Sequence, residues 1–434
     1  MTPELDSRGP GEECLVIDGC TPLRGQVVVS GSKNAALPEM AAALLTSGPL
    51  RLSNVPEIED VGTMCAILAS LGVAATRDSD RLEIDPSGLV GGEPDLAAAG
   101  RMRASLLLLG PLLAATGEAN LPRPGGDDIG ARRIEQHVVG LRQMGAEVDD
   151  SGGGIRARAR RLHGAHILLD MPTVTGTENL MMAAVRADGI TIISNAAREP
   201  HVVDLALCLN SMGARITGAG TERVVVEGVA ALHQAEHRVR SDYIEAGTYA
   251  LAAAATSGDL LIQGAVSDDL TQLLHKLRQA GCQVEEGADW VRVARHGGLT
   301  AVDMTTWPHP GFATDLQSQY VALMTQAQGE ATVWEALYEN RFRPVEQLRR
   351  LGARIAVEGR IAVVQGGHPL RGAELEVTDI RSGAALVIAG LCAEGTTTCR
   401  NVRHLDRGYQ NLVGKLALVG ANLSRRPEPE LAGA

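Results

Sequence analysis

A six-fold internal repeat is the feature that most constrains what this chain can fold into. The phrase apolar-Gly-small-x-apolar recurs as LGVAA, MGAEV, MGARI, AGCQV, LGARI and VGANL. The intervals between its glycines are 73, 68, 68, 71 and 68 residues. Such regular spacing over the whole chain predicts six copies of one folding unit. The glycines are Gly72, Gly145, Gly213, Gly281, Gly352 and Gly420.

A second phrase shows what each copy contains. An Ala/Leu-rich segment closes on glycine and is followed by an alternating strand such as LRLSNV or ITIISNA. Glycine suits the left-handed position that ends a helix. Together with the amphipathic segments between the phrases, this pattern predicts that each copy contains a strand, a helix, a second strand, a second helix and two paired strands. These second glycines are Gly48, Gly117, Gly189, Gly258, Gly329 and Gly395.

The length of 434 residues exceeds what one hydrophobic core usually organises, so two domains are expected. One copy cannot bury both faces of its sheet and helices, and three copies per domain fit the length. We therefore expect an α/β protein of two domains, each of three such strand–helix–strand–helix–paired-strand units. The first domain would span 33–241 and carry a lid loop at 121–131. The second would join 1–32 to 242–428, with the strand near 15–18 pairing in the C-terminal half, and 429–434 would be a disordered tail.

Composition excludes several classes of function. A formal net charge of -12 argues against general binding to nucleic acid or anionic membranes. The longest apolar stretch, 104–116, is interrupted by Gly110 and Pro111 and is too short to span a bilayer. The acidic N-terminal residues do not read as a secretory signal. Seven scattered cysteines, an odd number without a C-x-x-C pair, predict reduced thiols and a cytoplasmic protein.

Basic residues occupy corresponding loop-to-helix positions in several copies. Each lies among small or turn-forming residues, as in GSKNAALP and DIRSGA. One such residue alone is compatible with an ordinary surface arginine. Six at repeat-related positions predict a convergent anion pocket, because guanidinium groups bind phosphate and carboxylate bidentately. They are Lys33, Arg103, Arg132, Arg341, Arg381 and Arg407.

Three carboxylates stand beside these motifs. Asp127 and Asp128 lie in the Pro/Gly-rich stretch LPRPGGDDIGARR, which can act as a lid or can begin and cap the next helix. Asp315 lies in HPGFATDLQSQ, where Thr314 or Asp315 is equally a candidate N-cap. Histidines show no H-E-x-x-H or paired metal spacing, and there is no G-x-G-x-x-G or P-loop motif. The sequence thus supports neither a metal nor an organic cofactor.

Seven phrases together resemble a known family. GSKNAALP, MRASLLLLGPL, PGGDDIGARRIEQH, NAAREP, HPGFATDLQ, ENRF and LDRGY are similar to those of the UDP-N-acetylglucosamine 1-carboxyvinyltransferase family of enolpyruvyl transferases. The resemblance covers nearly the whole chain in colinear order. It implies two inside-out α/β barrel domains, each of three βαβαββ units, that close around the substrates. It also implies transfer of enolpyruvyl from phosphoenolpyruvate to the 3′-hydroxyl of UDP-N-acetylglucosamine with release of phosphate. It implies that the enzyme needs no cofactor and that its partners are small-molecule substrates. It also implies a monomer or a weak homo-oligomer.

The resemblance also implies roles for individual residues. Asp315 would take the hydroxyl proton and Asp127 would replace the reactive lid cysteine of many members, with Lys33 and Arg407 also catalytic. Arg341 and Arg381 would support the closed site. Further contacts to phosphoenolpyruvate and the acceptor would come from Asn34, Arg103, Arg132, Arg133, Ile134, Glu135, Gln136, Thr173, Val174, Thr175 and Leu337.

The acceptor is where the sequence departs most from this family. Met171 stands where some members have lysine, and Thr175-Gly176 replaces Gly-Ala. Loss of a positively charged side chain near the nucleotide is compatible with an acceptor that carries a different number of phosphates. The alternatives are therefore a paralogue that uses another uridine nucleotide, such as UMP in nucleoside-antibiotic synthesis, and a catalytically silent homologue. The intact basic residues argue against the silent homologue.

Overall fold

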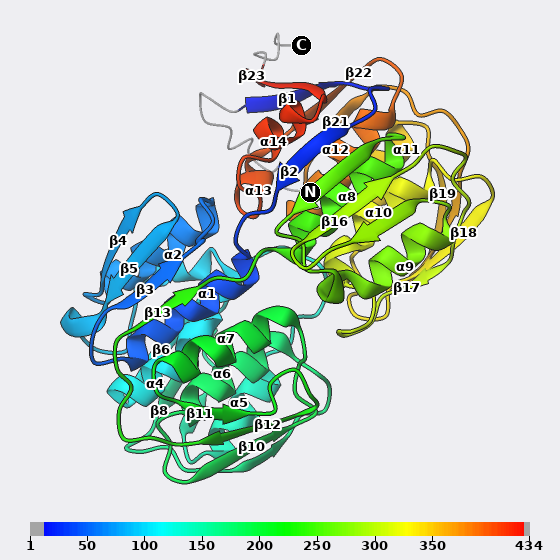
Figure 1. Cartoon of the computed structure of the whole chain (residues 1–434). Coiled ribbons are helices and arrows are strands. Elements are labelled where there is room, and N and C mark those ends of the chain that lie inside the picture. The colour runs from blue at the N-terminus through cyan, green and yellow to red at the C-terminus, as the bar shows by residue number, and fades with distance from the viewer. Residues whose placement is uncertain (1–12, 429–434) are drawn as a thin grey trace, which may run out of the picture. The chain divides into compact units, whose positions relative to one another are not determined.

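The chain forms two compact units, seen in a computed structural model that describes residues 13–428 (Figure 1). Unit 1 runs to Val28 and then takes in Ile244–Thr306 and the chain from Phe312. Unit 2 comprises Val29–Tyr243 and Trp307–Gly311. The expected tail at 429–434 lies outside the described residues. Within those residues, no helix is both long and apolar enough to cross a membrane.

Unit 2 contains three sheets and a set of central helices. The strand orders are β13-β3-β5-β4, β6-β8-β7 and β11-β12-β10-β9. Its strands are β3 (Leu50–Ser53), β4 (Ala74–Asp78), β5 (Arg81–Asp85), β6 (Glu118–Pro122), β7 (Glu147–Asp149), β8 (Gly154–Arg158), β9 (His166–Leu168), β10 (Ile190–Ser194), β11 (Arg215–Thr217), β12 (Arg223–Glu227) and β13 (Ala235–Arg238). Its helices are α1 (Lys33–Ala42), α2 (Glu59–Ser70), α3 (Leu96–Gly100), α4 (Leu109–Thr116), α5 (Glu135–Gln143), α6 (Val174–Ala184) and α7 (Pro200–Ser211), with 3-10 turns η1 (Ala43–Leu45), η2 (Pro86–Gly88) and η3 (Arg103–Leu108).

Unit 1 repeats this plan with sheets β15-β16-β14-β2, β17-β18-β20-β19 and β21-β22-β1-β23. Its strands are β1 (Glu13–Asp18), β2 (Arg24–Val28), β14 (Asp259–Gln263), β15 (Gln283–Glu286), β16 (Trp290–Ala294), β17 (Met304–Thr305), β18 (Glu330–Trp334), β19 (Arg354–Glu358), β20 (Ile361–Gln365), β21 (Glu374–Glu376), β22 (Thr396–Arg400) and β23 (Asn422–Pro427). Its helices are α8 (Tyr243–Ala255), α9 (Thr271–Gln279), α10 (Gln317–Met324), α11 (Pro344–Arg350), α12 (Ile380–Cys392), α13 (Arg403–Asp406) and α14 (Leu412–Leu418), with η4 (Ser267–Leu270) and η5 (Thr314–Leu316).

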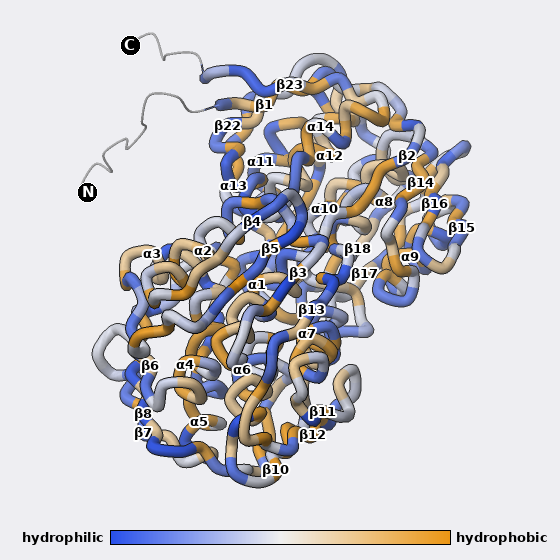
Figure 2. Tube along the Cα trace, turned by 60° about the vertical axis from the view of Figure 1, so that its left-hand side comes forward, coloured by the Kyte–Doolittle hydropathy of each residue, from blue (hydrophilic) through white to orange (hydrophobic). Residues whose placement is uncertain are grey.

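The sheets enclose one buried helix from each repeat, which is the inside-out arrangement that the family resemblance implies. In α6 every residue from Gly176 to Ala184 is buried, and α10 is buried along its full length. The outer helices, such as α9, bury only one side. Figure 2 shows hydrophobic and hydrophilic residues alternating along the trace of both units, as expected where elements bury one face.

Two strands pair within one unit and then continue into a helix of the other unit, and we call them the exchanged strands. β2 precedes α1 of unit 2 but pairs in parallel with β14 of unit 1. β13 precedes α8 of unit 1 but pairs in parallel with β3 of unit 2. The expected pairing of the N-terminal strand with the C-terminal half is confirmed, because β1 lies between β22 and β23 and is antiparallel to both.

The repeat glycines differ in conformation. All six glycines of the first phrase have positive φ, between 82° and 99°. Four glycines of the second phrase have positive φ, namely Gly117, Gly189, Gly329 and Gly395. The other two, Gly48 and Gly258, do not have positive φ. The prediction of left-handed glycines there is therefore correct for four of the six copies. In the copy with Gly258, the preceding Ser257 takes the positive φ of 53°.

Replacing Gly189 by alanine should destabilise unit 2, because φ at this position is +98° while no atom lies within 4 Å of the added Cβ. The left-handed conformation alone should lower the free energy of unfolding by about 1–2 kcal/mol. Gly62→Ala is the matched control, since Gly62 lies inside exposed α2 with equally open space. It should raise stability by about 0.5–1 kcal/mol. Urea unfolding checks both, and equal effects would contradict the conformational explanation.

Candidate active site

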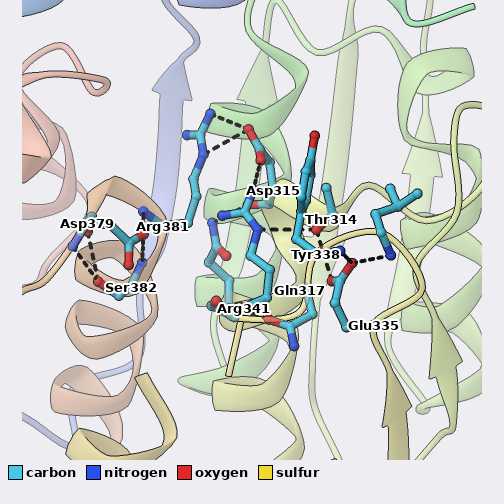
Figure 3. A network of polar contacts seen from close by, with 12 residues as sticks. Thr314, Asp315, Gln317, Glu335, Tyr338, Arg341, Asp379, Arg381 and Ser382 are labelled. Atoms are coloured by element: carbon cyan, nitrogen blue, oxygen red, sulfur yellow. Dashed lines mark hydrogen bonds and ion pairs between the residues drawn. The ribbon is translucent and has the colours of Figure 1, made fainter. Parts of the chain in front are cut away.

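Asp315 is held by two arginines in unit 1 (Figure 3). Its Oδ1 accepts a short hydrogen bond from Nη2 of Arg341. Its Oδ2 accepts from Nε of Arg381 at 3.1 Å and from Nη2 at 2.9 Å. The structure thus brings together three of the residues that the sequence singles out, from η5, from the loop before α11 and from α12.

Burial makes this cluster more than a surface ion pair. The arginine side chains are 6% and 7% exposed, and that of Asp315 is 26% exposed. Arg341 lies over the ring of Tyr338 at 5.7 Å, and Arg381 lies over that of Tyr409 at 5.6 Å. Aromatic faces attract desolvated cations. The two guanidinium groups are therefore fixed in direction, with Asp315 the more exposed member.

Glu335 is linked to Arg341 through the hydroxyl group of Thr314. Thr314 donates from Oγ1 to Oε2 of Glu335 at 2.9 Å and accepts from Nε of Arg341 at 3.2 Å. The other carboxylate oxygen of Glu335 accepts from the backbone N–H groups of Leu337 and Tyr338 at 2.9 and 3.1 Å. Glu335 is fully buried and follows β18 directly. Sequence reasoning missed it, because an acidic residue after a strand looks like ordinary loop composition.

Arg381 is positioned by the start of α12. Asp379 caps this helix by accepting from the backbone N–H groups of Arg381 and Ser382 at 2.9 and 3.0 Å. Ser382 completes the capping box by accepting from the backbone of Asp379 at 3.0 Å. Arg407, the other predicted arginine of unit 1, ends α13 two residues before Tyr409. It is therefore close in sequence to the aromatic ring that Arg381 contacts.

In unit 2, Lys33 and Arg103 also begin helical segments. Lys33 is the first residue of α1, and its Nζ lies 2.5 Å from Oδ2 of Asp60 in the first turn of α2. Asn34 follows it in the same turn. Arg103 begins η3 and donates a short hydrogen bond from Nη2 to the backbone oxygen of Arg132. The structure thus joins Arg103 to the stretch 132–136, which the resemblance implicates in substrate binding.

The lid loop lies against Arg103. A Cβ added to Gly126 would fall 2.8 Å from Cβ of Arg103, and φ at Gly126 is +101°. Asp127, the next residue, is partly buried, while Asp128 is exposed. The alternative that these aspartates cap the next helix is wrong, because α5 begins at Glu135 with Ile134 as N-cap.

The predicted acceptor-binding residues lie around the starts of α5 and α6. Gln136 donates from Nε2 to the backbone oxygen of Met171 at 3.3 Å and accepts from its N–H at 3.5 Å. Thr173 caps α6 by accepting from the N–H of Gly176 at 3.3 Å. Val174 is the first residue of α6 and packs partly against the hydrophobic core of unit 2. The exposed members of this group are Arg133 and Glu135.

His137 orients Thr175 by a chain of hydrogen bonds. Asn179 accepts from the N–H of Gly110 at 2.7 Å, which fixes its amide so that Nδ2 donates to Nδ1 of His137 at 3.2 Å. His137 must then carry its proton on Nε2 and donate to Oγ1 of Thr175 at 3.2 Å. Burial, with a smaller effect of Arg103, lowers the pKa of His137 to about 3. The hydroxyl hydrogen of Thr175 is thereby directed away from His137.

Neither Thr314 nor Asp315 caps α10, so both alternatives of the sequence are wrong. η5 begins after Ala313, which makes no side-chain cap, and Leu316 precedes α10. Both side chains point instead into the arginine cluster (Figure 3). Sequence alone could not decide this, because the partners of Asp315 lie 26 and 66 residues away and those of Thr314 lie 21 and 27 residues away.

Comparison with known proteins defines the class of this molecule. The model of the family EPSP synthase (3-phosphoshikimate 1-carboxyvinyltransferase) matches residues 17–416. The chain belongs to this family and is an enolpyruvyl transferase. It is similar to the enolpyruvyl transferase NikO from Streptomyces tendae, with 29% identity, a TM-score of 0.87 and coverage of 97% of this chain and 100% of that one. An EPSP synthase from Acinetobacter baumannii shares the fold, with 17% identity, a TM-score of 0.74 and coverage of 96% and 100%.

Burial of neutral His137 should make stability fall in acid. The unfolded chain binds a proton below the ordinary histidine pKa of 6.5, which the folded chain excludes until about pH 3. Above pH 6.5 this histidine does not change the free energy of unfolding with pH. Below pH 6.5 it lowers the free energy of unfolding by about 1.4 kcal/mol per pH unit. The difference in unfolding free energy between wild type and His137→Gln should therefore fall by about 2 kcal/mol from pH 7.5 to 5.0.

Urea unfolding at the two pH values measures this difference. His163→Gln is the control, because His163 is exposed in the same unit. A constant difference between wild type and His137→Gln would show that His137 takes up its proton in the folded state, and the assignment of the donor to Thr175 would fail.

Proposed function

We propose that this enzyme transfers the enolpyruvyl group of phosphoenolpyruvate to the 3′-hydroxyl of UDP-N-acetylglucosamine and releases phosphate. Such a reaction belongs to peptidoglycan precursor synthesis in the cytoplasm. The observation that carries the proposal is the exposed face of Asp315 between two buried arginines. It supplies a proton acceptor beside fixed cations, which is what attack by a hydroxyl group on an anionic substrate requires.

The reaction forms and breaks one carbon–oxygen bond. Asp315 accepts the hydroxyl proton as the oxygen attacks C2 of phosphoenolpyruvate, and Asp127 delivers a proton to C3. Loss of a proton from C3 then restores the double bond as phosphate departs from C2. Cationic side chains stabilise the carboxylate and phosphate throughout; these are Lys33, Arg103, Arg132, Arg341, Arg381 and Arg407.

The pairing of Asp315 with arginine bears on its role. Both oxygens of Asp315 accept hydrogen bonds from guanidinium groups, so one of them must exchange its partner before it can accept the hydroxyl proton. We propose that the substrate phosphate and carboxylate compete with Asp315 for these arginines and so release a carboxylate oxygen at the moment of attack.

The second candidate acceptor is UMP or another uridine nucleotide with fewer phosphates. Met171 favours it, because its side chain is 50% exposed and apolar on the loop that Gln136 holds. A cation there would suit the second phosphate of a diphosphate. Thr175 is left to donate one hydrogen bond to a phosphate oxygen. The likeness to NikO, an enolpyruvyl transferase, is compatible with either acceptor.

Phosphate release from phosphoenolpyruvate tests the function, with UDP-N-acetylglucosamine and UMP compared at equal concentration. We expect release with UDP-N-acetylglucosamine at a kcat/KM at least about tenfold higher than with UMP, since a second phosphate and a sugar add contacts. The reverse order would establish the second candidate. No release with either would overturn both acceptors.

Asp315→Ala and Arg407→Ala serve as controls in this assay. Each should lower turnover by at least about two orders of magnitude, the size of general-base and charge-stabilising effects. Far-ultraviolet circular dichroism should show an unchanged fold. Turnover near that of wild type in either variant would show that the residue does not have the role we assign to it.

Asp127 predicts resistance to fosfomycin, an antibiotic that alkylates the lid cysteine of family members that have one. A carboxylate is a much poorer nucleophile toward an epoxide than a thiolate. Asp127→Cys should retain activity and gain time-dependent inhibition, with the added mass on the lid peptide. Asp128→Cys is the matched control and should gain less inhibition, because this neighbouring side chain is exposed. A stoichiometric adduct on the wild-type protein would contradict the assignment of Asp127.

A further inference from the structure

A second cluster of ionisable side chains lies in the interior of unit 2 and takes no part in the proposed reaction. Glu39 comes from α1, Asp204 from α7 and His237 from β13. Their nearest ligand-type atoms all lie within 4.8 Å of one another. Glu39 is fully buried, Asp204 is 5% exposed and the side chain of His237 is 13% exposed. Residues distant in sequence thus converge on one point of the core.

Glu39 is the member of this cluster whose carboxylate oxygens lack hydrogen-bond partners. Neither of its carboxylate oxygens makes a hydrogen bond in the structure, although its Oε1 lies 3.5 Å from Nε2 of His237. A buried carboxylate without hydrogen bonds is costly, because it loses its hydration and gains little in return. The surroundings add to this cost, since fully buried Glu178 also has an oxygen without a hydrogen bond and Glu39 and Glu178 repel one another. The site therefore favours a bound positive charge.

The separations fit a small divalent cation. Nε2 of His237 lies 3.2 Å from Oδ1 of Asp204 and 3.5 Å from Oε1 of Glu39. Zinc bonds of about 2.0–2.1 Å at tetrahedral angles place ligand atoms about 3.3 Å apart. The second oxygen of Asp204 accepts from the backbone N–H of Arg240 at 2.8 Å, which fixes the carboxylate as an outer contact fixes a metal ligand. One imidazole nitrogen and two carboxylate oxygens are a donor set that zinc accepts.

We propose that Glu39, Asp204 and His237 bind one divalent transition-metal ion of the zinc type in unit 2. The ion is structural, because it joins the central helix α1 to α7 and to the exchanged strand β13. The partly exposed ring of His237 provides the route from solvent. Since α1 begins with Lys33, the ion also secures the helix that presents this residue.

The competing occupant of the cluster is a proton. Burial raises the pKa of Glu39 to about 8, and although burial lowers the pKa of His237, its interactions with Asp204 and Glu39 raise that pKa to about 10. A neutral carboxylic acid or a protonated His237 would therefore also relieve the repulsion. The two occupants predict different behaviour toward added metal. A metal site stabilises the folded chain in proportion to the concentration of the ion, whereas a protonated site gains nothing from it.

Metal titration of the full-length chain, with any affinity tag removed and after treatment with a chelator, tests the proposal. Cobalt is the spectroscopic probe, and zinc displaces it. We expect one equivalent per chain with visible d–d bands of a low-coordinate site, loss of the bands on addition of zinc, and a rise in melting temperature with either metal. Absence of a tight equivalent in the wild-type protein would overturn the proposal, whatever the variants do.

Variants identify the ligands. Glu39→Gln keeps the shape of the side chain and should weaken cobalt binding by at least about tenfold, the range seen on removal of a metal contact. Glu178→Gln is the matched control, because it neutralises an equally buried carboxylate outside the ligand set, and it should keep the cobalt bands. If Glu39→Gln fails to fold, Asp204→Asn takes its place. Bands that persist unchanged in the ligand variants would place the metal elsewhere and contradict the assignment.

Discussion

The central helices of both units are surrounded by protein on every side, and the rest of the structure follows from this enclosure. A helix buried all round favours small and aliphatic residues, which make up most of α12 and the C-terminal halves of α6 and α10. Aromatic residues make up only 2% of the chain, which permits close packing of these helices. Polar side chains are disfavoured in the middle of such helices, where Glu39 and Glu178 are exceptions. They gather instead at the N-terminal ends, where helix amides favour anions.

That enclosure explains where the functional residues lie. Lys33 opens α1, Thr173 caps α6 and Arg381 stands in the first turn of α12. Asp315 lies in the turn before α10. The ends of the buried helices are therefore the positions at which the fold tolerates charge, and the repeat places an equivalent end in each copy. Repetition of one folding unit thus becomes repetition of candidate anion-binding positions.

Much of this could be predicted from the sequence, because the repeat leaves a regular trace. The glycines Gly72 to Gly420 mark turns with positive φ in all six copies, and the alternating strands follow at fixed distances. The class of enzyme could also be predicted, because the phrases that resemble the enzyme family are spread along nearly the whole chain. What the sequence could not give depends on contacts between distant residues. The pairing of Asp315 with Arg381, the orientation of Thr175 by His137 and the convergence on Glu39 each require the folded core.

The place of β1 has a consequence for how the chain is made. Leu15 pairs with Cys399, and Glu13 pairs with Pro427 at the other edge. A ribosome that adds about 5–20 residues per second releases the first strand roughly 20–80 s before its partners exist. During that interval unit 2 is complete as far as Tyr243, so its core can form while the N-terminal strand stays unpaired. The sheet that contains β1 can close only after β22 and β23 have both been made.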